Sequence, residues 1–385
     1  DQTHFLRDDF PHDAILGLGE FAAEHWNPKL KEEGLSLTRY KFENYIAELW
    51  YRSDTKMALL SGAPFDDPSW WLLGNDQIVA ARDMINDFAG TTRMLGHSVI
   101  TPGQDGWMDE AERSMSELKP NSWKSYTIGD PLSPSKYPWR LDDEKLMYPF
   151  YEKSLKAGIN TICIHKGLLP PDYETSFKGV WKYATVDDLP KAAKDWPEMN
   201  FVIYHSALRP FLELPDQAWK EFEESGGYIK WASDLARIPE EHGVSNVYGE
   251  LGSTFANSAV AHPRFCAAFI GTLVKGLGAD HVVWGTDTVW YGSPQWQIEA
   301  MRRLEVPEDM QKKYKLPSLG GPNSLTKQAI FGLNSARIYG LSMNEATNMP
   351  DLPNFSEDKI AGLAAKFREA GGGPSNKRFG YTRKA

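Results

Sequence analysis

Short apolar runs recur along the chain, and longer segments with helical spacing of apolar residues separate them. The runs lie near residues 1–5, 56–60, 94–101, 123–128, 159–165, 200–205, 246–251 and 281–287. Their length and their β-branched and aromatic residues predict β-strands. Amphipathic spacing predicts helices between them, among them 41–52, 76–89, 109–118, 143–157, 186–196, 217–225, 263–276 and 294–304.

The alternation of strands and helices predicts an α/β fold with parallel strands, and eight repeats predict a closed (β/α)8 TIM barrel with loop insertions. We expect the barrel to span residues 1–341, and the long interval 6–55 to add helix and a lid over the barrel mouth. A late helical stretch contains Asn334 as an expected N-cap. Residues 342–385 form a C-terminal extension, with one helix near 356–370 and then a basic tail, expected to be a packed arm or disordered.

Four side chains that can bind metals end four of the strand-like runs. His165 ends the run from Ile159, His205 ends the run from Asn200, and Asp287 ends the run from His281, while His4 lies in the first run. Each is in phase with alternate residues of its own run, so all four side chains can point to one interior position. Imidazoles with one carboxylate suit zinc or a similar divalent ion, and barrel active sites lie at these strand ends.

Composition narrows the class of protein. The formal net charge of -10 argues against a nucleic-acid partner, and 41% hydrophobic residues indicate a globular chain. The cysteines Cys163 and Cys266 make neither a disulfide framework nor a CxxC metal site. No run is apolar enough for a membrane helix, so no membrane partner is expected. We expect a cytoplasmic location, or the periplasm if a leader preceded residue 1, because a core strand that starts there indicates that upstream residues are missing.

These pieces together resemble the amidohydrolase superfamily, in the branch of aminocarboxymuconate-semialdehyde decarboxylase and related one-metal enzymes. The matching pieces are Asp1-Gln-Thr-His-Phe5, Ile164-His165, Tyr204-His205, Trp284-Gly-Thr-Asp287 and Asn334-Ser-Ala-Arg-Ile-Tyr-Gly340. They cover roughly the first 340 residues in the family's order. The resemblance implies a distorted (β/α)8 barrel with hydrolytic, decarboxylating or hydrating activity.

The same resemblance implies roles for individual residues. His4, His165 and Asp287 correspond to metal ligands, and His205 corresponds to the acid/base histidine beside the metal. The family pattern His-x-His reads Gln2-Thr-His4 here, so Gln2 stands where a ligand histidine is expected, and its amide oxygen is a weaker ligand. We expect one divalent ion, zinc first and manganese or iron as alternatives. A second ion is not expected, because Lys124 begins the fourth run and does not end it.

Other residues are candidates for binding a small-molecule substrate. Arg140 and Arg209 could clamp a carboxylate, and Lys166 could turn into the pocket, although strand parity directs it outward. Trp290 and Tyr291 follow the last strand and could form an aromatic wall. A homodimer is the default expectation for the assembly.

Three functions remain open from the sequence. The first is a metal-dependent hydrolase of a small aromatic or cyclic amide, ester or lactone, with Asp287 and His205 at the reacting centre. The second is a non-oxidative decarboxylase or hydratase of an aromatic or unsaturated acid on the same scaffold. The third, motivated by Gln2, is a catalytically silent binding barrel.

Overall fold

The computed structural model describes residues 1–341, 343–344, 349–350 and 355–374. Its main sheet consists of nine strands in the order β8-β7-β6-β5-β4-β3-β2-β1-β9, and all neighbouring strands are parallel. The strands are β1 (Gln2–Thr3), β2 (Ala58–Leu60), β3 (Met94–Val99), β4 (Ser122–Tyr126), β5 (Thr161–His165), β6 (Asn200–Tyr204), β7 (Val247–Glu250), β8 (Val282–Val283) and β9 (Gly285–Thr288). Each lies within a predicted run or within one residue of it.

The barrel closes through the last run, which the buried Trp284 divides into two short strands. β8 pairs with β7, whereas β9 pairs with β1, and the register shifts between Gln2 and Thr3. One continuous segment therefore joins both ends of the sheet. The predicted TIM barrel is confirmed, and its eighth strand is interrupted.

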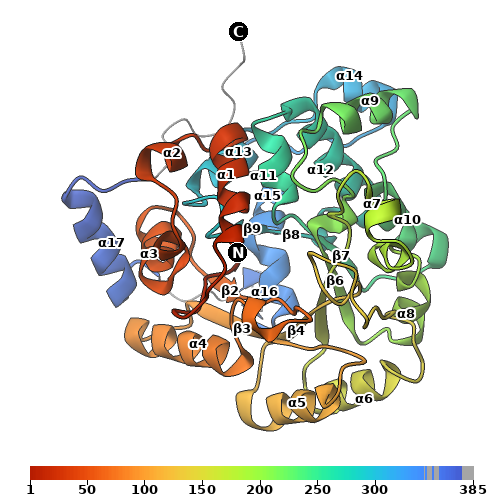
Figure 1. Cartoon of the computed structure of the whole chain (residues 1–385). Coiled ribbons are helices and arrows are strands. Elements are labelled where there is room, and N and C mark those ends of the chain that lie inside the picture. Colours follow the sequence, from red (N-terminus) through yellow and green to blue (C-terminus); the bar gives the residue numbers. More distant parts are fainter. Residues whose placement is uncertain (342, 345–348, 351–354, 375–385) are drawn as a thin grey trace.

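Helices connect successive strands and surround the barrel (Figure 1). They follow from amphipathic segments whose apolar face packs against the strands, as in α4, where Ile78, Ala81 and Ile85 are buried. The connecting helices include α4 (Asn75–Ala89), α5 (Trp107–Arg113), α6 (Tyr148–Lys156), α8 (Leu189–Asp195), α9 (Asp216–Glu224), α12 (Pro263–Leu277) and α13 (Gln295–Arg303).

The interval between β1 and β2 contains additional helices, as expected. They are α1 (Leu16–His25), α2 (Lys29–Glu33) and α3 (Phe42–Ile46). Other helices were not predicted from the pattern, namely α7 (Tyr173–Ser176), α10 (Ala232–His242), α11 (Thr254–Ala259) and α14 (Glu308–Tyr314). α10 contains Pro239, an unfavourable residue inside a helix.

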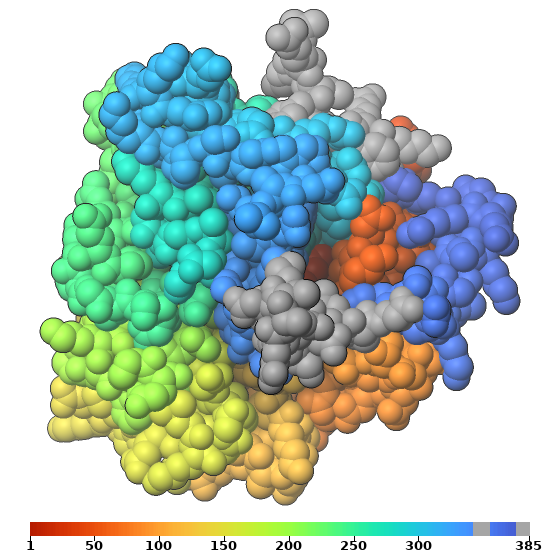
Figure 2. Space-filling model, turned by 180° about the vertical axis from the view of Figure 1, so that it is seen from behind, coloured from red at the N-terminus to blue at the C-terminus, as the bar shows by residue number. Residues whose placement is uncertain are grey.

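The segment after α13 returns to the barrel through α15 (Leu325–Gln328) and α16 (Asn334–Ile338). The prediction that Asn334 caps a helix is wrong, because its backbone is helical and continuous with the preceding turn. Its side-chain amide instead donates to the carbonyl oxygens of Ala279 and Val282, each at 2.8 Å. Asn334 thus ties this helix to β8. Figure 2 shows the segment in blue on the rear face.

The C-terminal extension packs on the barrel through α17 (Lys359–Glu369), as predicted for residues 356–370. Arg368 donates to the carbonyl oxygens of Tyr51 and Ser53, and Arg93 forms a buried ion pair with Asp358. A short antiparallel pair, β10 (Met343–Asn344) and β11 (Met349–Pro350), precedes α17. The predicted basic tail, residues 375–385, lies outside the described residues. Within the described part of the chain, no helix is long and apolar enough to cross a membrane.

Candidate functional site

A small cavity of about 90 Å³ lies at the carboxyl ends of the strands. His4, His165, His205 and Asp287 all line it, so the fold brings together the four residues that the sequence singled out. They come from the segments that end β1, β5, β6 and β9. The rest of the lining is largely apolar and aromatic, with Ile15, Leu18, Ala63, Phe65, Leu72, Tyr126, Pro131, Leu132, Leu168, Phe211, Ser253, Trp290 and Tyr291.

His4 is held by a backbone carbonyl. Its Nδ1 lies 2.7 Å from the carbonyl oxygen of Ser61, which can only accept, so Nδ1 carries the proton. In the neutral ring, Nε2 is then a lone-pair acceptor. It lies 3.1 Å from Oδ1 of Asp287 and 2.7 Å from Nε2 of Gln2. A histidine fixed at one nitrogen by a carbonyl is the usual arrangement of a metal ligand.

His205 has the same arrangement. Its Nδ1 lies 2.7 Å from the carbonyl oxygen of Gly252, which leaves Nε2 as the accepting nitrogen. Burial lowers its pKa to about 4, although the carboxylate of Asp287 opposes that shift. Its ring centroid lies 4.5 Å from that of His165. Burial, His205 and Lys124 also lower the pKa of His165, so both rings are neutral at pH 7.

Asp287 is an ionised carboxylate. Burial by itself would raise its pKa. The contact with His4, which is a hydrogen bond when His4 is protonated at Nε2, the charge of His205 and the hydrogen bond from Ser253 outweigh burial and hold the pKa well below its usual range. Oδ1 is directed at His4, and Oδ2 accepts a hydrogen bond from the hydroxyl of Ser253. The Ser253 oxygen also lies 2.5 Å from the hydroxyl of Tyr291.

Backbone strain concentrates at these positions. His205, Ser253 and Asp287 have φ values of 62°, 52° and 58°, in the left-handed region that non-glycine residues seldom adopt. Ser206 and Ala207 continue the left-handed turn. Such conformations cost about 1–3 kcal/mol each and cluster at functional sites.

The donor set fits a divalent cation. Neutral His4 presents an unprotonated Nε2, the neutral ring of His165 lines the same cavity, and an ionised carboxylate oxygen of Asp287 lies beside His4. Nitrogen and carboxylate oxygen ligands suit zinc, manganese or iron. The described residues contain no group of three or more His, Cys, Asp or Glu side chains already spaced to hold an ion.

Gln2 lies beside the site and also lines a second cavity. This larger cavity, of about 660 Å³, borders residues that begin strands, such as Ala58 and Leu95, and therefore lies toward the opposite end of the barrel. In Figure 2 the first residues of the chain, in dark red, lie recessed there. Neither His165 nor Asp287 lines it, so the smaller cavity is the candidate active site.

Glu250, at the end of β7, supports the backbone below the site. Its carboxylate accepts from the backbone N–H groups of His205, at 3.2 Å, and Gly252, at 2.7 Å. Burial and the nearby charge of Asp287 raise its pKa to about 7.

Three residues considered for substrate binding are not among the residues that line the cavity. Arg140 forms a bidentate pair with Asp142. Arg209 pairs with Glu213 and donates to the carbonyl oxygen of Leu169. Each arginine therefore already pairs with a carboxylate of this chain, and its binding of a substrate carboxylate stays a prediction.

Lys166 is fully buried and points away from the cavity, as strand parity indicated. Its ammonium lies 2.8 Å from Asp188 and donates to the carbonyl oxygens of Tyr183 and Thr185. Its contacts are therefore those of a structural residue.

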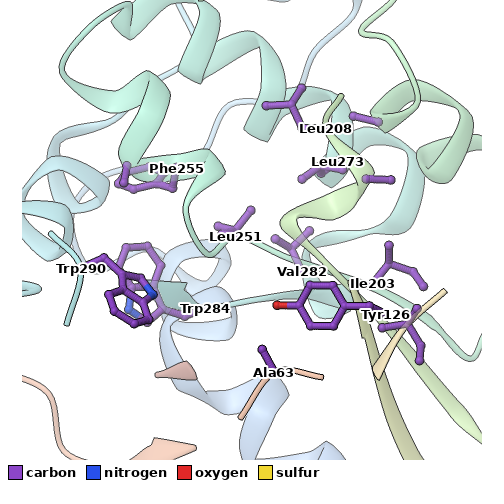
Figure 3. Packing of buried hydrophobic residues seen from close by; sticks show 14 of the residues in the cluster. Ala63, Tyr126, Ile203, Leu208, Leu251, Phe255, Leu273, Val282, Trp284 and Trp290 are labelled. Carbon is purple, nitrogen blue, oxygen red and sulfur yellow. The ribbon is translucent and has the colours of Figure 1, made fainter. Parts of the chain in front are cut away.

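Trp290 and Tyr291 do lie in the lining, as the aromatic-wall hypothesis expects. In Figure 3, Trp290 and Tyr126 lie on opposite sides, with Ala63 between them. Tyr126 stacks on His165, with ring centroids 4.2 Å apart and planes 19° apart. Tyr126 was not among the candidates from the sequence, although it ends β4 in phase with Lys124.

Ser253 was also missed, because it follows β7 by three residues and no strand periodicity reaches that loop. Lys124 lies inside the barrel below Tyr126, with Nζ 3.4 Å from the ring centroid of Tyr204. It is absent from the cavity lining.

Comparison with solved structures shows the fold. An uncharacterized TIM-barrel protein from Bordetella bronchiseptica is 12% identical, with a TM-score of 0.52, over 88% of this chain and 98% of that one. 5-Carboxyvanillate decarboxylase from Sphingomonas paucimobilis is 15% identical, with a TM-score of 0.44, over 89% and 98%. A dihydroxybenzoic acid decarboxylase from Polaromonas, with bound manganese, is 14% identical, with a TM-score of 0.48, over 89% and 96%. At these identities the likeness extends to the fold alone.

No curated protein matches the chain. The family model described as amidohydrolase matches residues 57–341, which is well over half of the chain. The match begins after β1 and includes the strand ends that carry His165, His205 and Asp287. The chain therefore belongs to the amidohydrolase family of enzymes.

Proposed function

We propose that the chain is a metal-dependent decarboxylase that removes a carboxylate non-oxidatively from a small aromatic or unsaturated acid. The observation that carries the proposal is the charge of the cavity. None of its described lining residues is a lysine or arginine. An enzyme that only recognises a substrate carboxylate normally binds it with such a cation. In this cavity the substrate carboxylate would have to bind at the metal position, where it becomes the reacting group.

His4, His165 and Asp287 are the proposed ligands of a divalent ion, with Gln2 beside them. Such an ion orients a carboxylate and stabilises the charge that develops in the reaction. The walls formed by Tyr126 and Trp290 would hold an aromatic ring and keep water away.

His205 is the proposed proton carrier. In the reaction the bond between the carboxylate and its carbon breaks, the electron pair remains on that carbon, and a proton forms the new C–H bond. Nε2 of His205 is the nitrogen that can hold this proton, because Nδ1 is already committed to Gly252. With a pKa of about 4 the ring is neutral at pH 7, so Nε2 would first take this proton from solvent, and the protonated ring is then a strong donor to the carbon.

A second candidate is hydrolysis of an uncharged amide, ester or lactone. The neutral imidazole of His205 favours it, since an unprotonated ring is a base for a water nucleophile. An uncharged substrate would also need no cationic clamp.

The test combines metal analysis with product analysis. About one equivalent of zinc, manganese or iron is expected in the purified protein and little in His165→Ala, with the peripheral His25→Ala as a control. Carbon dioxide released from small aromatic acids supports decarboxylation, whereas consumption of neutral lactones or esters without it supports hydrolysis. If the wild-type protein binds no metal, even after reconstitution, both candidate functions are contradicted.

A further inference from the structure

Gln2 differs from the other candidate ligands because its amide nitrogen, and not its oxygen, faces His4. In the neutral form of His4, Nδ1 carries the proton and donates to Ser61, so Nε2 accepts a hydrogen bond from the Gln2 amide, at 2.7 Å. In this orientation the amide N–H of Gln2 donates to the Nε2 lone pair of His4, which is the lone pair that would bind a cation.

The other end of the same amide has no partner. Oε1 of Gln2 is buried and accepts no hydrogen bond. Its neighbour is the carboxylate of Glu250. The space beside Gly252, where a Cβ would lie, is 3.2 Å from Oε1 of Gln2 and 2.8 Å from Oε1 of Glu250. When Glu250 is ionised, two acceptors therefore border one space, and an unpaired buried acceptor is unfavourable.

A half-turn about the last side-chain bond of Gln2 exchanges the two amide atoms. Oε1 would then face Nε2 of His4 and Oδ1 of Asp287, the two atoms that lie 3.1 Å apart. The amide nitrogen would face Glu250, whose oxygens are held in place by the backbone of His205 and Gly252. The orientation that supplies an oxygen ligand also supplies the missing hydrogen-bond partner.

We propose that Gln2 binds the cation through Oε1 after its amide turns over, and that Glu250 is the positioning residue that fixes the turned amide. The inference rests on the proposed cation site. In the metal-free protein, Gln2 caps His4, and cation binding replaces that cap.

The test is calorimetric titration of the chelator-stripped full chain with Zn²⁺ and with Mn²⁺. Gln2→Leu is compared with Gln297→Leu, a matched control. Like Gln2, Gln297 is buried, its amide nitrogen donates one hydrogen bond, and its Oε1 has no hydrogen-bond partner. The acceptor for Gln297 is the carbonyl oxygen of Thr286, at 3.1 Å. Gln2→Leu should weaken cation binding tenfold or more, as for the loss of a ligand or its support, whereas Gln297→Leu should not.

Glu250→Gln, alone and combined with Gln2→Leu, tests the positioning role. Glu250→Gln should weaken cation binding severalfold in the wild-type background. In the Gln2→Leu background it should have no further effect. Melting temperatures of the metal-free variants report any loss of folding separately. Equal effects in both backgrounds would show that Glu250 acts only on the backbone, and would overturn its positioning role.

The outcomes separate this inference from the proposed function. A wild-type protein that binds neither cation defeats the cation site itself. Unchanged or tighter binding by Gln2→Leu, with wild-type binding intact, overturns the ligand role alone. A structure of the Zn²⁺-loaded protein gives a second readout, because a ligand oxygen lies about 2.0–2.2 Å from zinc.

Discussion

Ser253 and Asp287, 34 positions apart in the sequence, are joined by a hydrogen bond from the serine hydroxyl to Oδ2 of the carboxylate. Both residues have left-handed backbone conformations, with φ values of 52° and 58°. The bond occupies one carboxylate oxygen and leaves the other directed at His4. The strained loop after β7 therefore orients a side chain at the end of β9.

Ser253→Ala should weaken cation binding about tenfold, because residues that support a ligand typically contribute that much to metal affinity. The measurement is competition for Zn²⁺ against a chelator. Ser258→Ala is the control, since Ser258 is also buried and its hydroxyl donates to backbone carbonyl oxygens of its own helix. Equal affinity in all three proteins would remove Ser253 from the site.

The stability of the metal-free protein should fall as the pH drops from about 6.5 to about 4. His205 has a folded-state pKa of about 4, against an unfolded value of about 6.5. Between these values the unfolded chain binds the extra proton, so the stabilisation is complete above the unfolded pKa and is lost on acidification.

Urea unfolding of the wild type and His205→Asn at pH 5 and pH 7 measures this effect. Asparagine tolerates the left-handed backbone and does not titrate. The loss of stability between the two pH values should be smaller in the variant, by about 1–2 kcal/mol. An identical pH dependence would contradict the lowered pKa.

Gln2→His should retain Zn²⁺ longer than the wild type during dialysis against a chelator. An imidazole nitrogen binds a borderline ion more strongly than an amide oxygen does. Retention at the wild-type rate would indicate that residue 2 lies outside the ligand shell.

Lys166→Met should destabilise the fold without affecting cation binding. The substitution leaves Asp188 buried without its ammonium partner, and breaking a buried pair in this way costs about 3–5 kcal/mol. Urea unfolding measures the loss. Lys191→Met, which removes a partly exposed pair with Asp195, should cost less than about 1 kcal/mol.

The positions of the main strands could be predicted because each run is short, apolar and separated from the next by an amphipathic segment. The same periodicity placed His165 and Asp287 at strand ends, and parallel strands bring their carboxyl ends together. It also indicated that Lys166 points outward, and the buried pair with Asp188 agrees with that parity.

Loop geometry could not be predicted in the same way, because side-chain direction outside a strand depends on contacts across the fold. Arg140 pairs with Asp142, Asn334 holds β8, and Ser253 reaches Asp287 through a strained turn. No local pattern in the sequence encodes these partners.

The sequence by itself determined the alternating barrel, the family and the convergence of His4, His165, His205 and Asp287, because strand periodicity fixes side-chain direction locally. Only the tertiary structure decided which nitrogen of His4 and of His205 is free in the neutral ring, how Gln2 presents its amide and that the described cavity lining lacks a lysine or arginine. Those features depend on backbone carbonyls and carboxylates from distant segments, and packing alone brings these groups together.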